Sequence, residues 1–499
     1  MTPMRSSMDS ADAAPRRGWQ QSALAALLPA AVVLALAGAL FGAAPQRFLP
    51  VWNDEVVYWN EAAVFAHAGF DGGYITADER TAPAEFSHFG AHGPFFAVLH
   101  GSIGRVVGWA PYSAFLINLA VISLSAFAWF RASAGGSAGS APLLVATFWP
   151  LLLYLPTNMQ EPTHFAFAFL FALAIDRPAR PGAWTSAWTA LLIVVASLLR
   201  PSWALMILPL GWVAARRSGP WAVAVLTVVT VAAAAAAWSA FGLLASPFQN
   251  SMQQLTQAVI ENPTAAPATM VSKAAINLKW WFATSEDQPP EIVFRYFLAI
   301  FMAALFLRLV IAWLRKRDAT EALEQCALVL APVVTMVICF GQVESWRDFR
   351  LLAPHVLTAL LIVAAKARWA RWLWGATLLF VPLHYQQFVE FHEERFTSDP
   401  APIAAMRDAA AAAMPFVPGA SPWRNTLLVP IELVQFPLLG LPPGIGISYV
   451  IDWSDMKDVQ SAYVLLGPGD REEAKTLGPL VPLAETPLGT LYRNAGPAR

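Results

Sequence analysis

Two adjacent carboxylates, Asp54 and Glu55, open the polar segment that follows the first long apolar run. Holding acidic groups beside a membrane span costs free energy unless they have a partner or a chemical task. A carboxylate can accept the proton of a hydroxyl group and act as a general base. Asp54 is the candidate base, and Glu55 is the candidate for positioning an acceptor or a metal ion. The alternative is a solvated pair of surface acids.

Arginines stand near the ends of two later apolar runs. Arg200 precedes a proline, and Arg347 and Arg350 lie close together further along the chain. A guanidinium binds phosphate oxygens in a bidentate manner, so these three are candidate phosphate-binding residues. The structural alternatives are ion pairs of Arg347 and Arg350 with Glu344 and Asp348, and an interfacial Arg200 that keeps its charged head in water.

Two sets of residues are candidates for holding a metal ion. Asp54 or Glu55 can hold a divalent ion through carboxylate oxygens. The pair His88-x-x-x-His92 has the spacing of a zinc site on a helix. Neighbouring glycines disfavour a stable helix there, so the carboxylates are the preferred candidates.

The composition is that of a membrane protein rather than a soluble globule. Of 499 residues, 57% are hydrophobic and 13% are charged, whereas about a quarter of a soluble domain is charged. Apolar runs of about 16–24 residues recur along most of the chain. The net charge of -1 gives no reason to expect a nucleic-acid partner. Cys326 and Cys339 lie about 20 Å apart in one expected helix, too far for a disulfide.

The lysines and arginines determine the expected topology, because basic loops stay on the cytoplasmic side. They predict a mainly α, polytopic fold of about eleven spans, with the N-terminus inside and the C-terminus outside. Residues 1–18 form the expected cytoplasmic tail, and residues 19–384 the transmembrane domain. A cleaved signal peptide is the competing interpretation of the first apolar run. The expected spans cover residues 23–44, 111–130, 141–155, 163–175, 202–215, 221–241, 292–314 and 351–365, and runs that end near residues 200, 342 and 384.

The polar residues gather on the outer side in two long segments, residues 45–110 and residues 242–291. The first contains an expected interfacial helix over residues 54–67. Residues 92–109 are rich in glycine and apolar on one side, which favours an amphipathic helix on the membrane surface. A true membrane span is the alternative for this stretch.

Residues 385–499 differ in character from the rest and predict a small α/β domain outside the membrane. Glycine and proline turns separate its runs of apolar and β-branched residues. The expected elements are a helix over residues 399–414 and strands over residues 426–431, 447–451, 462–466 and 489–493.

Four places along the chain carry motifs that occur in the same order in a known family. They are Asn53-Asp54-Glu55-x-x-Tyr58, Ala91-His92-Gly93-Pro94-Phe95-Phe96, Glu161 between the third and fourth expected spans, and Arg347-Asp348-Phe349-Arg350-x-x-x-Pro354. Over residues 19–365 the chain resembles the GT-C glycosyltransferases, which include the lipid A aminoarabinose transferases and the protein O-mannosyltransferases. Gly93 stands where the family has a first proline. The structural alternative for Glu161 is a cap of the helix that follows it.

The resemblance implies an integral-membrane glycosyltransferase that takes a sugar from a polyprenyl-phosphate carrier. It implies a catalytic role for Asp54 and Glu55, and substrate or phosphate contacts from Tyr58, His92 and Glu161 beside the arginines. Some members of the family need a divalent metal ion and others do not. The implied location is the bacterial inner membrane, with the site and the C-terminal domain on the periplasmic side.

The residues also predict a lipid-linked sugar donor independently of the resemblance, because the sequence offers no cytoplasmic site for a nucleotide sugar. No cytoplasmic loop is long enough for a phosphate-binding domain, and no glycine-rich phosphate loop occurs in the sequence. An activated sugar at the outer face must then arrive on a lipid phosphate in the bilayer. The acceptor is a hydroxyl of a glycan, a lipid or a protein. A transporter or lipid flippase, and a non-enzymatic scaffold for envelope assembly, are the alternative functions.

Overall fold

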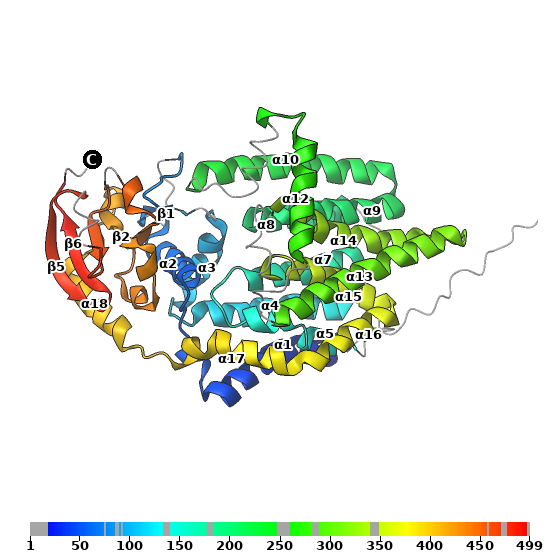
Figure 1. Cartoon of the computed structure of the whole chain (residues 1–499), viewed down its shortest axis with the longest axis horizontal. Helices are drawn as coiled ribbons and strands as arrows, with labels where there is room; N and C mark the ends of the chain where they lie inside the picture. Colours follow the sequence, from blue (N-terminus) through cyan, green and yellow to red (C-terminus); the bar gives the residue numbers. More distant parts are fainter. Residues whose placement is uncertain are drawn as a thin grey trace, which may run out of the picture.

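The computed structural model describes residues 18–73, 76–84, 89–90, 93–132, 140–176, 183–246, 260–281, 289–339, 349–456, 459–470 and 477–496. The molecule is elongated (Figure 1), with a helical bundle at one end and a β-sheet at the other. Helices α2 (Asn53–Ala68) and α3 (Phe95–Val107) lie between them. The chain is mainly helical with a small sheet, which confirms this part of the predicted fold class.

Most helices of the bundle run along the long axis of the molecule (Figure 1). The bundle consists of α1 (Trp19–Phe41), α4 (Ser113–Ala132), α5 (Ala141–Ala146), α6 (Trp149–Tyr154), α7 (Glu161–Asp176), α8 (Ala183–Leu199), α9 (Ile207–Ser218), α10 (Pro220–Leu244), α12 (Ala266–Trp281), α13 (Pro289–Leu314), α14 (Thr320–Cys339), α15 (Ala353–Lys366), α16 (Arg368–Thr377) and α17 (Val381–Thr397).

Three helices among the described residues, α1, α4 and α13, are long and apolar enough to span a membrane. The expected number of spans is therefore not confirmed, because several expected spans are shorter or broken. Residues 141–155 form α5 and α6, which are separated at Thr147 and Phe148. Pro150 lies in the first turn of α6, and a proline cannot continue a helix that begins before it. The segment Pro201–Met206 is a 3₁₀ helix that precedes α9.

Helices α2 and α3 pack closely, which explains the glycines of the expected surface helix. A Cβ at Gly101 would lie 2.8 Å from the carbonyl oxygen of Ala62, and one at Gly104 would lie 2.8 Å from the ring of Trp109. A side chain at Gly101 would push α3 away from α2, and one at Gly104 would displace the ring of Trp109. At about 1.5 Å per residue α3 is about 20 Å long, shorter than the roughly 30 Å hydrocarbon core of a bilayer.

The C-terminal part supplies five strands of a six-stranded sheet in the order β1-β3-β2-β4-β6-β5. The predicted helix and four predicted strands are present to within about two residues, the usual disagreement at element ends. Helix α17 continues to Thr397, so the expected domain boundary at residue 384 lies inside it. The elements are α18 (Ala401–Ala413), β2 (Thr426–Pro430), β3 (Gly446–Val450), β4 (Tyr463–Leu466), β5 (Leu480–Thr486) and β6 (Gly489–Asn494).

Two strands of the sheet were not expected from the sequence. β5 contains Pro482 and lies at the sheet edge, where a missing N–H is tolerated. β1 (Thr76–Ala77) comes from the first outer segment and pairs with β3 in parallel. Its two residues are too few to show a strand period.

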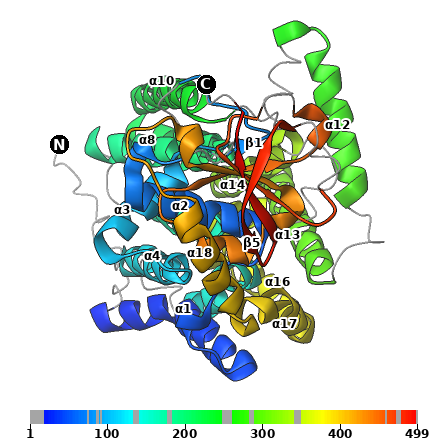
Figure 2. The same ribbon diagram turned by 90° about the vertical axis from the view of Figure 1, so that its left-hand side faces the viewer.

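Further contacts join the first outer segment to the sheet. The carboxylate of Glu79 accepts hydrogen bonds from the backbone nitrogens of Gln460 at 2.6 Å and Ser461 at 2.8 Å. Apolar side chains of α2 also pack in one cluster with residues of the sheet and the loops around it. Viewed from the sheet end (Figure 2), α2 and the bundle lie behind the strands. The sheet therefore positions α2, which carries the two carboxylates.

Candidate active site

Asp54 lies in the first turn of α2, beside a small cavity between this helix and the C-terminal domain. Its side chain is 45% exposed. The cavity measures about 60 Å³. Its lining residues come from α2 and from β3 and a loop of the C-terminal domain: Asn53, Asp54, Val57, Tyr58, Ile431, Val434 and Tyr449. Asp54 is therefore an acid that a substrate in this cavity can reach.

Arg350 is the cation beside Asp54. One of its guanidinium nitrogens, Nη1, lies 3.6 Å from Oδ2 of Asp54, and both side chains are partly exposed. This separation exceeds the roughly 2.7–2.9 Å of a tight charge-assisted hydrogen bond. An ion pair of this kind contributes about 0–1 kcal/mol to stability. Arg350 thus places a positive charge at the candidate base without locking the carboxylate.

Tyr58 lies one helical turn after Asp54, on the same side of α2. Burial raises the pKa of its phenol well above the ordinary value, and the charges of Asp54 and Glu161 raise it further, while Arg350 lowers it. The hydroxyl is therefore neutral and can donate a hydrogen bond. The pKa of this phenol therefore responds to charges from three distant parts of the chain.

Glu161 and Arg200 form a buried ion pair at the end of the bundle. Nη2 of Arg200 lies 2.6 Å from Oε1 of Glu161, and their side chains are 13% and 4% exposed. Glu161 is the first residue of α7, where a negative charge is also favourable to the helix. The cap and the ion pair therefore coexist. Oε2 of Glu161 and Nη1 of Arg200 are buried without a hydrogen-bond partner among the described residues.

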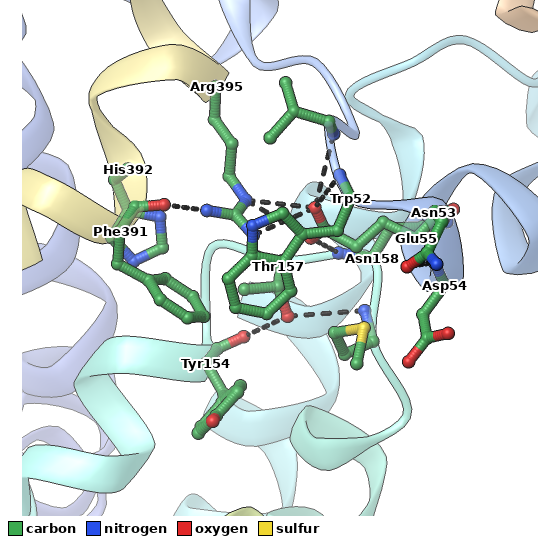
Figure 3. Close-up of polar contacts among 12 residues, drawn as sticks. Trp52, Asn53, Asp54, Glu55, Tyr154, Thr157, Asn158, Phe391, His392 and Arg395 are labelled. Carbon is green, nitrogen blue, oxygen red and sulfur yellow. Dashed lines mark hydrogen bonds and ion pairs between the residues drawn. The ribbon is translucent and has the colours of Figure 1, made fainter. Parts of the chain in front are cut away.

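Glu55 lies in a different environment from its neighbour (Figure 3). Its carboxylate is fully buried and pairs with the fully buried Arg395 of α17, with 3.0 Å between Oε2 and Nη2. It also accepts hydrogen bonds from the backbone nitrogens of Val51 and Trp52 at 3.3 Å and of Asn158 at 3.0 Å. The predicted contact of Glu55 with an acceptor stays a prediction, and the observed partners give it the task of fixing the start of α2.

The guanidinium of Arg395 is held by aromatic rings as well as by Glu55. It lies over the rings of Trp52 at 4.3 Å and Phe391 at 4.4 Å, and Nη1 donates to the carbonyl oxygen of Phe391. Such cation–π contacts favour a guanidinium over an ammonium. The sequence analysis missed Arg395, because it lies in the helix that crosses the expected domain boundary.

Asp54 and Glu55 do not fit a shared metal ion. In Figure 3 the Asp54 carboxylate points away from Glu55 and its partners. Among the residues that the structure describes, no three His, Cys, Asp or Glu side chains gather in a way that could hold a metal. His88 and His92 lie outside the described residues, as does Arg347. The predicted metal ion, and the substrate contacts of His92 and Arg347, therefore stay predictions.

Tyr449 belongs to the wall of the cavity, and two buried histidines lie beside the 3₁₀ helix that follows Arg200; the sequence analysis singled out none of the three. Tyr449 of β3 lines the cavity, and burial together with Asp54 and further acids raises its pKa to about 12. In the bundle, the indole nitrogen of Trp203 donates to Nδ1 of His164 at 3.0 Å, and its ring lies 4.1 Å from that of His355. The sequence signal for the histidines was their position on the outer side. No signal in the sequence pointed to Tyr449.

Glu61 is a buried acid one turn beyond Tyr58. Its Oε1 accepts a hydrogen bond from the backbone nitrogen of Gly90 at 3.1 Å, and Oε2 has no partner among the described residues. Burial raises the pKa of this carboxyl to about 8. Folding therefore favours the protonated form of Glu61 at neutral pH.

Glu61→Gln is expected to make the melting temperature less sensitive to pH. In the unfolded wild type the carboxyl ionises above its ordinary pKa, while in the folded protein it stays protonated up to about pH 8. The wild type therefore loses stability as the pH rises from about 5 to 8, because the folded state binds the extra proton. The measurement is the melting temperature of both proteins at pH 5 and pH 8, with the exposed Glu393→Gln as control. Equal slopes would show that Glu61 is ionised when folded.

No protein-family model matches the chain, and a comparison with curated proteins finds no match. Among solved structures, the chain is similar to the crystal structure of ArnT from Cupriavidus metallidurans bound to undecaprenyl phosphate. The similarity covers 94% of this chain and 98% of that chain, at 14% identity and a TM-score of 0.48. The similarity concerns the course of the chain alone.

Proposed function

We propose that this chain is an integral-membrane glycosyltransferase that moves a sugar from a polyprenyl-phosphate carrier to a hydroxyl acceptor. The observation that carries the proposal is the exposed Asp54 beside Arg350, at a cavity next to an apolar helical bundle. Group transfer from a phosphate needs a base for the acceptor and a cation for the leaving group. The two side chains supply both at one place.

In the proposed reaction Asp54 takes the proton of the acceptor hydroxyl. The acceptor oxygen then bonds to the anomeric carbon of the sugar, and the bond from that carbon to the phosphate oxygen breaks. Negative charge grows on the departing polyprenyl phosphate, where the guanidiniums of Arg350 and Arg200 stabilise it. The neutral phenol of Tyr58 can donate a hydrogen bond in the same site. Glu55 acts as a positioning residue through Arg395.

An apolar groove supports a lipid carrier for the donor. It measures about 340 Å³ and lies between α7 and α8, lined by residues such as Phe167, Leu170 and Leu192. α7 begins at Glu161 and α8 ends directly before Arg200. A lipid phosphate at Arg200 can therefore extend its apolar chain along this groove. We place the protein in the bacterial inner membrane, with the N-terminus cytoplasmic and the site and C-terminal domain periplasmic.

The test is a transfer assay with the purified full chain. Synthetic polyprenyl-phosphate sugars are supplied with a mixture of envelope glycolipids, and the release of free polyprenyl phosphate is measured together with the glycosylated product. We expect both products to appear in equal amounts. Movement of the lipid-linked sugar between bilayer leaflets without release would indicate a flippase instead. If neither release of polyprenyl phosphate nor movement between leaflets is observed, the scaffold function remains.

Arg350→Lys is expected to slow this transfer by about 10–100-fold, since a charged hydrogen bond contributes about 1.5–3 kcal/mol. Lysine keeps the charge but loses the two-pronged geometry that suits phosphate. The melting temperature should change little, because the pair with Asp54 is partly exposed. The control is Arg80→Lys, whose arginine pairs with Asp78 at 3.5 Å. Full activity of Arg350→Lys would indicate that Arg200 or Arg347 binds the phosphate instead.

A further inference from the structure

A second cleft lies along α2, toward the end of the helix that is farther from Asp54. It measures about 280 Å³, with α2 and α3 on one side and residues 441–445 of the C-terminal domain on the other. Ligand pockets commonly measure about 300–1,000 Å³ and combine apolar walls with a few polar groups. The cleft therefore has room for about one or two sugar rings.

Two tryptophans in the wall of the cleft are fixed by hydrogen bonds. Nε1 of Trp59 donates to the carbonyl oxygen of Ala110 at 2.9 Å, and Nε1 of Trp109 donates to that of Trp59 at 3.1 Å. Both polar edges are thus satisfied within the protein, and the rings remain as apolar walls. Gly104 allows this arrangement, because a Cβ there would meet the Trp109 ring. Apolar walls of this kind fit the C–H faces of a sugar.

Asn60 supplies an unsatisfied polar atom in the wall of the same cleft. The residue is 3% exposed, and its Nδ2 donates to the carbonyl oxygen of Ile445 at 3.4 Å. Its Oδ1 is buried without a hydrogen-bond partner among the described residues. Leaving a buried acceptor unpaired costs about 1–3 kcal/mol. A ligand hydroxyl in the cleft would satisfy this oxygen.

The charges around the cleft point to an anionic ligand. Arg105 and His67 are exposed and line it. No acidic side chain occurs among the described residues that form its walls. A guanidinium there attracts a carboxylate or a phosphate on the ligand.

We propose that this cleft binds the acceptor, which is a glycan bearing an anionic group. The assignment of the ligand as the acceptor rests on the proposed transfer reaction. Asn60 is six residues after Asp54 on one helix, which places it about 9 Å farther along the axis. A sugar held in the cleft can therefore belong to the same short glycan as the hydroxyl that Asp54 deprotonates.

Saturation-transfer NMR on the full chain in nanodiscs tests the binding. The probes are maltose, which is neutral, maltose 1-phosphate, which carries a phosphate, and digalacturonate, which carries carboxylates. We expect an acidic probe to bind about tenfold more tightly than maltose, from one charged hydrogen bond. Arg105→Gln should abolish this preference for acidic probes, and Asn60→Leu should weaken the binding of all three probes. Arg493→Gln on the exposed face of β6 is the control.

The result that overturns the proposal is binding of acidic probes to Arg105→Gln as tight as to the wild type. Failure of every probe to bind the wild type would also overturn it. Arg105 is exposed, so this variant remains informative even where Asn60→Leu unfolds the protein. Asp54→Asn should bind the probes normally. Saccharide binding without any transfer by the wild type would reject the proposed reaction and leave the cleft as a glycan site.

Discussion

Asp54→Asn is expected to lower the turnover of sugar transfer by about 10²–10⁴-fold, the usual effect of losing a general base. Asparagine keeps the shape of the side chain but cannot accept a proton. The folded protein should be unaffected, because Asp54 is 45% exposed and lies 3.6 Å from Arg350. The measurement is product formation at saturating donor and acceptor, together with a melting curve.

The kinetic constants separate this role from a mere contact with Arg350. Loss of the base lowers kcat and leaves KM for the donor unchanged, whereas a displaced cation, which also contacts the phosphate of the bound donor, would raise KM for the donor as well as lowering kcat. Asp408→Asn is a matched control, since Asp408 pairs with Arg407 at 3.2 Å on the exposed face of α18. Near-normal turnover of Asp54→Asn would remove Asp54 from the catalytic role. The reaction would then need another base, and none of the other described acids lines the cavity.

Glu55→Gln is expected to destabilise the protein by about 3–5 kcal/mol, although Glu55 is the direct neighbour of Asp54 in the sequence. The substitution leaves the guanidinium of Arg395 buried and without its charged partner. It also turns an amide N–H₂ toward backbone nitrogens that are themselves donors. The measurement is the melting temperature in detergent, and transfer should be lost through unfolding rather than through chemistry.

A double substitution distinguishes the two causes of this instability. Replacing both members of a buried ion pair by apolar residues is often neutral. Glu55→Leu combined with Arg395→Met should therefore be more stable than either single change. The recovery should be partial, because the nitrogens of Val51, Trp52 and Asn158 would still lack their acceptor. A double variant no more stable than Glu55→Leu would show that these backbone contacts dominate.

The neighbouring acids Asp54 and Glu55 differ in role because their side chains leave α2 in different directions. Along α2 one residue turns the side chain by about 100°, so Asp54 and Glu55 leave the helix in different directions. Glu55 points toward Arg395 of α17 (Figure 3), whereas Asp54 lines the cavity. Their types and order predict chemistry for both. Only the packing of α17 against the start of α2 separates them.

The sequence by itself determined the membrane class, the helix that carries Asp54 and most of the C-terminal strands. These features are local, because hydrophobic periodicity and turn residues depend on neighbours within a few positions. It also gave Asp54, Glu161, Arg200 and Arg350 as candidates, since charged residues at the ends of apolar runs gather at one membrane face, and the motif resemblance added Tyr58. The structure pairs Asp54 with Arg350 and Glu161 with Arg200, and the roles of these residues stay predictions.

Only the tertiary structure decided the partners of these residues. Arg395 reaches Glu55 from a distant helix, Tyr449 reaches the cavity from the sheet, and β1 joins the sheet from the first outer segment. Pairings between distant segments depend on how whole elements pack, and a local period contains no information about them. The breaks within the expected spans also depend on the packing of whole elements. Short apolar segments such as α5 and α6 are buried against neighbouring helices, so neither has to be long enough to span the membrane.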